Sequence, residues 1–187
     1  ILIMCAICPI VLRNRLRKYG FFRYFCNRFS PKTDKLTELD IYKKDNMLDI
    51  NTIESFDKIA TPFYYYDMDL FRKTVDHVAE LASEHNLKVH YAIKANVERR
   101  LLEYISSKGF GADCVSGNEV LHAHSCGFPA DKIVYAGVGK SDKEIYDAMQ
   151  LGIEAFNCES LQEIFVINEM AHLHGVKASI SVRINPD

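Results

Sequence analysis

The fold is decided by the stretch Lys88-Val89-His90-Tyr91-Ala92-Ile93-Lys94-Ala95-Asn96, a short apolar run that ends on a lysine. Four similar runs follow it, each separated from the last by about 20–25 residues, the usual length of a parallel strand-plus-helix unit. We therefore expect five strands, at Lys88–Ile93, Gly111–Val115, Lys132–Ala136, Glu154–Cys158 and Ala178–Ile184.

Helical patterns lie between these strands and in front of the first one. The intervening helices are expected near Glu98–Ser107, Asn118–Cys126, Lys143–Leu151 and Leu161–His174, and each ends at a glycine-containing turn. Asp67 is expected to cap an earlier helix, whose apolar residues recur at helical spacing from Leu70 to Leu81. Alternating strands and helices indicate an α/β fold with a parallel sheet, either open and doubly wound or closed as a TIM (β/α)8 barrel.

Polar residues at the strand ends distinguish these two folds. In a barrel the C-terminal ends of the strands converge on one mouth, whereas an open sheet gathers its ligand groups at one switch point. Here all five strands have polar or glycine residues at or just past their C-terminal ends, which favours a barrel truncated after about the fifth strand. These residues are Lys94, Asp113, Ser116, Gly137, Gly139, Asn157, Glu159 and Arg183.

Lys94 has two readings on pattern alone. A lysine at the end of an apolar parallel strand is expected in a crowded, poorly solvated space, where desolvation lowers the ammonium pKa and leaves an amine that can attack an aldehyde. The other reading is a strand-end lysine turned to solvent. The pattern leaves both open.

His90-Tyr91-Ala92-Ile93-Lys94-Ala95-Asn96 resembles the cofactor-lysine segment of the fold-type III decarboxylases, which use pyridoxal 5′-phosphate (PLP) and have an alanine-racemase-like barrel. The similarity runs in order through Gly109–Gly117, Gly127–Ile133, Gly137–Ser141, Phe156–Ser160 and Val182–Pro186. Within the family, the Gly139-Lys140-Ser141 and Arg183-Ile184-Asn185-Pro186 stretches look most like the diaminopimelate branch.

The resemblance implies roles for three residues. Lys94 matches the lysine that binds PLP as a Schiff base, and Asp113 matches an acid close to it that would hold the positive charge in place. Arg183 matches an arginine near the cofactor ring, although a salt bridge to a neighbouring strand is a serious alternative. Ser116, Asn157 and Glu159 either line the mouth or serve packing and turns.

The implied activity is PLP-dependent decarboxylation of meso-2,6-diaminopimelate to L-lysine and CO2. An ornithine or arginine decarboxylase, or a non-catalytic PLP-binding homologue, is the alternative. The family's phosphate site, substrate-binding groups, C-terminal β domain and homodimer contacts lie beyond Asp187, so we expect this fragment to be inactive and not to fold stably alone.

The charge and the spacing of the tyrosines, histidines and glycines argue against several other kinds of binding site. The net charge of −2, and tyrosines without a basic groove, argue against nucleic-acid binding. Histidines spaced i,i+2 lie on different helix faces, so no metal site is expected. Gly137-Val138-Gly139-Lys140 has too few glycines for a phosphate loop, and we expect a tight turn with Lys140 exposed.

The N-terminal residues carry no functional weight in this reading. Ile1–Leu12 is too short an apolar run to span a bilayer, and its positive charges follow it, unlike those of a secretory signal. We expect residues 1–46 to lie outside the domain, Met47 to be a candidate start and residues 47–187 to form the N-terminal part of the barrel domain. Cysteines in apolar stretches, without a disulfide pattern, favour the cytoplasm.

Overall fold

The computed structural model describes residues 2–4, 10–11 and 50–184. The chain forms two compact units, residues 1–8 with 71–187 and residues 9–70. Most of the stretch 1–46 lies outside the described residues. No helix in the described part is both long enough and apolar enough to cross a membrane.

The smaller unit holds a short strand pair and a helix. Strands β2 (Ile10–Val11) and β3 (Tyr65–Tyr66) pair antiparallel, and helix α3 (Ile50–Phe56) lies between them in sequence. The Phe56 ring lies 5.0 Å from the Tyr65 ring, between centroids, which gives the unit an aromatic contact. Asp67 Oδ1 accepts hydrogen bonds from the backbone N–H groups of Leu70 (2.9 Å) and Asp69 (3.1 Å), so the predicted helix cap is confirmed.

The larger unit is built on a six-stranded parallel sheet with the order β1-β4-β5-β6-β7-β8. The predicted alternation of strands and helices is confirmed, with boundaries that differ by a few residues. The strands are β1 (Leu2–Met4), β4 (Val89–Ala92), β5 (Gly111–Cys114), β6 (Ile133–Ala136), β7 (Ala155–Cys158) and β8 (Ile180–Val182). The helices are α4 (Met68–Glu84), α5 (Arg99–Ser107), α6 (Gly117–Ser125), α7 (Asp142–Leu151) and α8 (Leu161–Leu173), with 3₁₀ turns η1 (Ile93–Ala95) and η2 (Ala130–Lys132).

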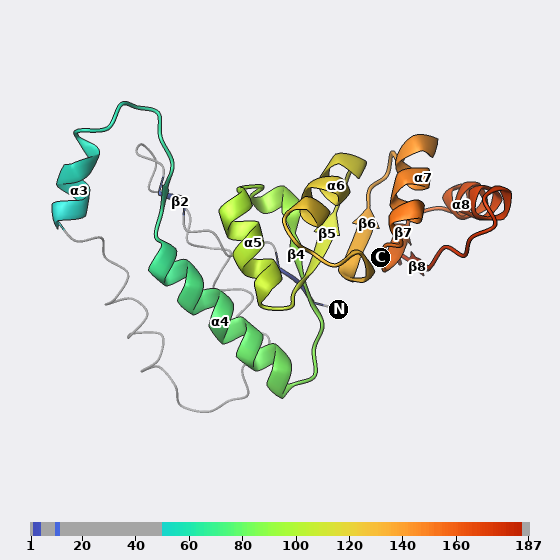
Figure 1. Cartoon of the computed structure of the whole chain (residues 1–187), viewed down its shortest axis with the longest axis horizontal. Helices are drawn as coiled ribbons and strands as arrows, with labels where there is room; N and C mark the ends of the chain where they lie inside the picture. The colour runs from blue at the N-terminus through green and yellow to red at the C-terminus, as the bar shows by residue number, and fades with distance from the viewer. Residues whose placement is uncertain (1, 5–9, 12–49, 185–187) are drawn as a thin grey trace. The chain divides into compact units, whose positions relative to one another are not determined.

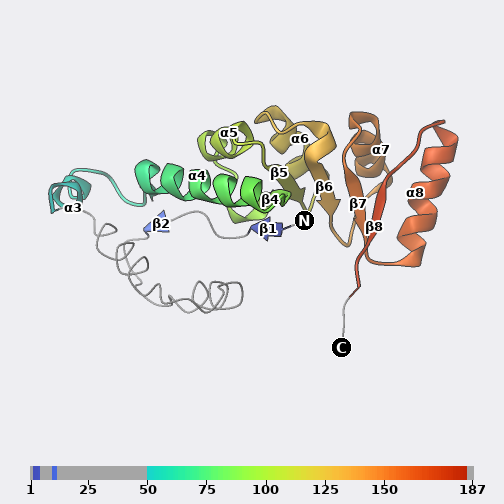
Figure 2. The same ribbon diagram turned by 90° about the horizontal axis from the view of Figure 1, so that it is seen from below.

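The helices α5 to α8 cover one face of the sheet (Figures 1 and 2). Strand residues alternate between the two faces, and the large ones on the helix side form the core. Tyr91, Ile133, Tyr135 and Phe156 are each at most 1% exposed. This burial explains why the strands are short apolar runs, and why the sheet needs its helices to be stable.

The opposite face of the sheet is concave. His90, in β4, hydrogen-bonds through Nε2 to Glu154 Oε2, just before β7, over 2.8 Å. Two strands lie between them, so a flat sheet would separate their backbones by roughly 14 Å and point both side chains straight outward. The contact therefore indicates that the sheet bends toward this face, as a barrel wall does. Within the described residues the barrel is not closed, since β1 and β8 are the two edges of the sheet.

A glycine makes the contact on this concave face possible. Gly111 pairs with His90 across the β4–β5 ladder, and a Cβ on it would lie 2.5 Å from both His90 Nε2 and the Lys132 carbonyl oxygen. Only glycine lets the imidazole lie across β5 toward Glu154.

Candidate active site at the C-terminal edge of the sheet

The three residues predicted to serve the cofactor lie at the same edge of the sheet. Lys94 is in η1, immediately after β4; Asp113 is in the last half of β5; and Arg183 directly follows β8. Because every strand pair from β4 to β8 is parallel, these positions share the C-terminal edge, where the strand-to-helix loops also lie. The concave face and this edge together form the candidate site.

Asp113 is the buried member of the site. It is 5% exposed, and its Oδ1 has no hydrogen-bond partner among the described residues. Burial raises the pKa of its carboxyl above the ordinary value, while the positive charge of Lys94, then that of His90 and more weakly that of Arg183, lowers it. A buried carboxyl with an unused oxygen is costly unless a cation faces it, so Asp113 is prepared to hold a positive charge near Lys94.

Of the two interpretations of Lys94 that the sequence leaves open, the described residues show the exposed lysine at the end of a strand. The burial of β4 ends at Ile93, and Lys94 is exposed because the chain turns into η1 and leaves the sheet at the open edge. The amine is accessible to a small molecule at the C-terminal edge, and among the positive charges that act on the Asp113 carboxyl it has the largest effect.

Arg183 makes the salt bridge that was its alternative role. Its guanidinium donates to Glu159 Oε1 over 3.0 Å, and its backbone N–H donates to the Cys158 carbonyl over 2.9 Å. The side chain is 57% exposed, so this pair alone adds little to stability. The same arginine lowers the pKa of Asp113, so its positive charge also reaches the site.

The remaining polar residues of the edge serve the loops. Ser116 caps α6, and its hydroxyl accepts from the Glu119 N–H, which confirms the turn reading. The backbone carbonyl of Asn157 accepts a hydrogen bond from Lys140 Nζ over 3.1 Å, and the Glu159 carboxylate accepts one from the Arg183 guanidinium. Lys140 was expected to be exposed, and this was wrong: its side chain is 1% exposed, because Glu163 of α8 covers it as an ion pair.

A repeated Ser-x-x-Glu motif, which was not among the sequence predictions, fixes these loops. Ser-x-x-Glu begins α6, α7 and α8, with each serine as the N-cap and each glutamate three residues later. In α7 this is a full capping box between Ser141 and Glu144. The spacing alone was a sufficient signal for the caps, although not for what the glutamates reach beyond their own helices.

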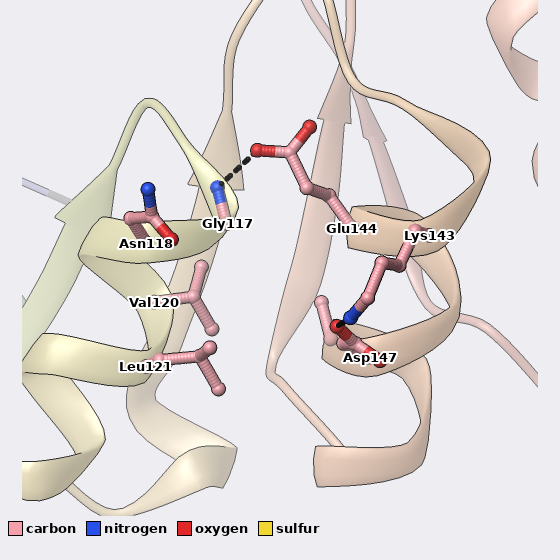
Figure 3. Close-up of a pocket in the computed structure, with 8 residues that line it drawn as sticks. Gly117, Asn118, Val120, Leu121, Lys143, Glu144 and Asp147 are labelled. Atoms are coloured by element: carbon pink, nitrogen blue, oxygen red, sulfur yellow. Dashed lines mark hydrogen bonds and ion pairs between the residues drawn. The ribbon is translucent and has the colours of Figure 1, made fainter.

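Glu144 also holds the neighbouring loop. Its Oε1 accepts from the Gly117 N–H at the start of α6 over 2.9 Å (Figure 3). Hydrogen bonds from Ser141 and from Gly117 lower the pKa of Glu144 to about 2. A Cβ at residue 117 would come within 2.5 Å of Glu144 Cγ, so glycine is required for this contact.

The groove drawn in Figure 3 lies between α6 and α7, on the helix side of the sheet. It is lined by residues such as Val120, Leu121 and Asp147, and contains none of Lys94, Asp113 or Arg183. The chemistry-bearing residues are at the edge of the sheet, so the groove is not the candidate site.

Comparison with known families identifies the fold of this site. Residues 69–187 match the family described as pyridoxal-dependent decarboxylase, pyridoxal binding domain. The chain belongs to this family. Its curved parallel sheet is therefore part of the PLP-binding barrel of the pyridoxal-dependent decarboxylases.

Several proteins similar to this chain are named diaminopimelate decarboxylase. A diaminopimelate decarboxylase from Bacteroides thetaiotaomicron is 47% identical over 142 residues, which are 75% of this chain and 37% of that protein. A crystal structure of diaminopimelate decarboxylase from Helicobacter pylori complexed with L-lysine has 37% identity and a TM-score of 0.62, covering 72% of this chain and 34% of that one. The corresponding enzyme from M. jannaschii in co-complex with L-lysine has 33% identity and a TM-score of 0.67, covering 73% and 33%. The chain thus spans about a third of the length of these relatives.

The family implies PLP, and the described residues fit the reactive end of that group. An aldehyde requires an accessible primary amine, which Lys94 offers, and a cationic nitrogen formed there requires a nearby anion. Asp113 Oδ1, buried and unpartnered within the described residues, is suited to that task.

Proposed function

We propose that the full-length protein is a PLP-dependent decarboxylase acting on meso-2,6-diaminopimelate to give L-lysine and CO2, with Lys94 as the cofactor-binding lysine. The observation that carries the proposal is the buried carboxyl of Asp113, whose Oδ1 has no hydrogen-bond partner among the described residues, at the same C-terminal edge of the sheet as the exposed Lys94. The names of the relatives, two of them solved with L-lysine bound, support the substrate.

Each residue has a distinct part. Bound PLP acts as an electron sink that stabilises the negative charge left when CO2 departs. Lys94 would supply the amine that holds the cofactor, and its exposed position leaves that amine accessible to small molecules. Asp113 holds positive charge at that nitrogen, and Arg183 adds a positive field from the end of β8.

Two finer features belong to the same proposal. We propose that the full-length protein works as a homodimer in the cytoplasm on a small amino-acid substrate. The homodimer rests on the resemblance to the family, and the cytoplasm on the cysteine pattern. Cys114, Cys126 and Cys158 are buried free thiols, as in a reducing compartment. Sedimentation of the purified protein and cell fractionation test these two points.

The central experiment is borohydride reduction of the full-length protein with PLP, followed by peptide mapping. The pyridoxyl label is expected on Lys94 and is expected to disappear in Lys94→Ala. Lys88→Ala is the matched control, because Lys88 precedes β4 at the opposite edge and is 77% exposed. A label on any other lysine would overturn the assignment.

The substrate is tested separately by measuring CO2 release from meso-diaminopimelate, L-ornithine and L-arginine. Release from diaminopimelate alone, with L-lysine as product, is the expected result. Preference for ornithine or arginine would move the protein to another branch of the family. PLP bound at Lys94 with no release from any of the three would indicate a non-catalytic homologue.

A further inference from the structure

Lys140 is a second lysine at the C-terminal edge, and the proposed chemistry does not use it. It lies in the β6–α7 loop with its side chain 1% exposed. Nζ donates to the carbonyls of Gly137 (2.7 Å) and Asn157 (3.1 Å), and forms an ion pair with Glu163 Oε1. An ammonium has three donors, and all three have an acceptor here.

The partner of Lys140 continues the connection toward the site. Glu163 uses its other oxygen, Oε2, to accept a hydrogen bond from the Glu159 backbone N–H over 2.9 Å. Glu159 in turn accepts from the Arg183 guanidinium over 3.0 Å. A continuous set of contacts therefore runs from the β6–α7 loop, through the start of α8, to the end of β8.

Burial makes it costly to remove either partner of the Lys140–Glu163 ion pair. Glu163 is 14% exposed and Lys140 1%, so removing either charge leaves the other in a poorly solvated place without its partner. The second lysine at the edge differs in this respect from Lys94, which is exposed. The Lys140 ammonium is thus buried and hydrogen-bonded, whereas the Lys94 side chain is exposed.

We propose that Lys140 is a positioning residue: through Glu163 and Glu159 it sets the place of the Arg183 guanidinium, and with it the positive field at the cofactor lysine. This inference rests on the proposed function, since it concerns how the cofactor is held at Lys94. It also states that Lys140, with every donor engaged, does not compete with Lys94 for the aldehyde.

The first test is the PLP dissociation constant of the full-length protein, followed by absorbance. Lys140→Met is expected to weaken PLP binding by about 3- to 30-fold, the usual range for a residue that acts through others. Lys143→Met is the matched control, because Lys143 is 83% exposed and pairs only with Asp147 of its own helix among the contacts described. It is expected to bind PLP as the wild type does.

Two further variants distinguish the positioning role of Lys140 from a purely structural role. Lys140→Met combined with Glu163→Gln removes both charges and is expected to fold even if the single variant does not, while still binding PLP weakly. In a Glu159→Gln background, Lys140→Met is expected to have little additional effect on PLP affinity, because the route to Arg183 is already weakened. Equal loss in both backgrounds would overturn the proposal, as would unchanged PLP affinity in a folded Lys140 variant.

The third readout needs no cofactor. Acetylation of amines in the apo protein, followed by peptide mapping, is expected to modify Lys94 and Lys143 quickly and Lys140 slowly. Fast acetylation of Lys140 would contradict a buried ammonium with all three donors engaged, even if PLP labels Lys94 as proposed. Failure of PLP to label Lys94, with Lys140 still protected, would instead refute the proposed function.

Discussion

His90 Nε2, in β4, and Glu154 Oε2, just before β7, lie 2.8 Å apart although β5 and β6 separate these two strands. The contact is possible because the sheet curves around its concave face. It joins a side chain that is 2% exposed to one that is 21% exposed, at the end of the sheet away from the candidate site. The contact therefore holds two parts of the barrel wall together, and the charge of His90 also lowers the pKa of the Asp113 carboxyl at the candidate site.

Removing the imidazole is expected to destabilise the wall. His90→Ala leaves Glu154 without its buried partner, and we expect the free energy of unfolding of the full-length protein to fall by roughly 1–3 kcal/mol. Lys88→Ala removes the other, exposed partner of Glu154 and is expected to cost less than about 1 kcal/mol. Urea unfolding measures both, and an equal effect of the two variants would show that burial does not matter here.

A methyl group at Gly111 is expected to disturb the same contact. The added Cβ of Gly111→Ala would meet the His90 ring and a backbone oxygen, each at 2.5 Å, so we expect a loss of about 1–3 kcal/mol. Gly139→Ala is the control, since no described atom lies within 4 Å of the place its methyl group would take. Comparable melting temperatures for Gly111→Ala and Gly139→Ala would contradict the close approach of the His90 ring to Gly111.

Glu144 is expected to make stability depend on acid pH. Its pKa is lowered from an ordinary 4.5 to about 2, so its contribution is full above about pH 4.5 and is lost as the pH falls toward 2. At pH 7, Glu144→Gln is expected to cost about 0.5–2 kcal/mol, as loss of a helix cap does. Unfolding curves of both proteins from about pH 7 to about pH 3 test this, and a difference that does not shrink with falling pH would refute it.

Asp113 is expected to control the ionisation of the nitrogen that joins Lys94 to PLP. Asp113→Asn removes the negative charge near that nitrogen, so the absorbance of the bound cofactor is expected to titrate at a lower pH than in the wild type. A pH titration of the absorbance of the bound cofactor measures the change. Asp131→Asn, at an exposed position just before β6, is expected to leave the titration as in the wild type.

The framework of the larger unit was predictable because its signals are local. Apolar runs, helical spacing and glycines at turns are read within a few residues, and Gly109, Gly127, Gly152 and Gly175 all adopt positive φ. The grouping of Lys94, Asp113 and Arg183 at one edge followed from parallel strands. What these residues bind stays a prediction.

Other features depend on contacts between distant parts of the chain. Lys140 reads as an exposed turn residue until Glu163, 23 residues later, is placed over it. The exposure of Lys94 depends on where β4 gives way to a 3₁₀ turn, a difference of about one or two residues. The His90–Glu154 contact requires the curvature itself, which no single strand encodes.

The glutamates that begin α7 and α8 also limit how this barrel can be recombined. In each, one carboxylate oxygen accepts a hydrogen bond from the residues just before its own helix, and the other binds the preceding βα unit, at Gly117 and at Lys140. Successive βα units are therefore not interchangeable modules. A chimera whose breakpoint falls at Gly152 would inherit Lys140 from one parent and Glu163 from the other, and would tolerate the join only where both parents keep that pair.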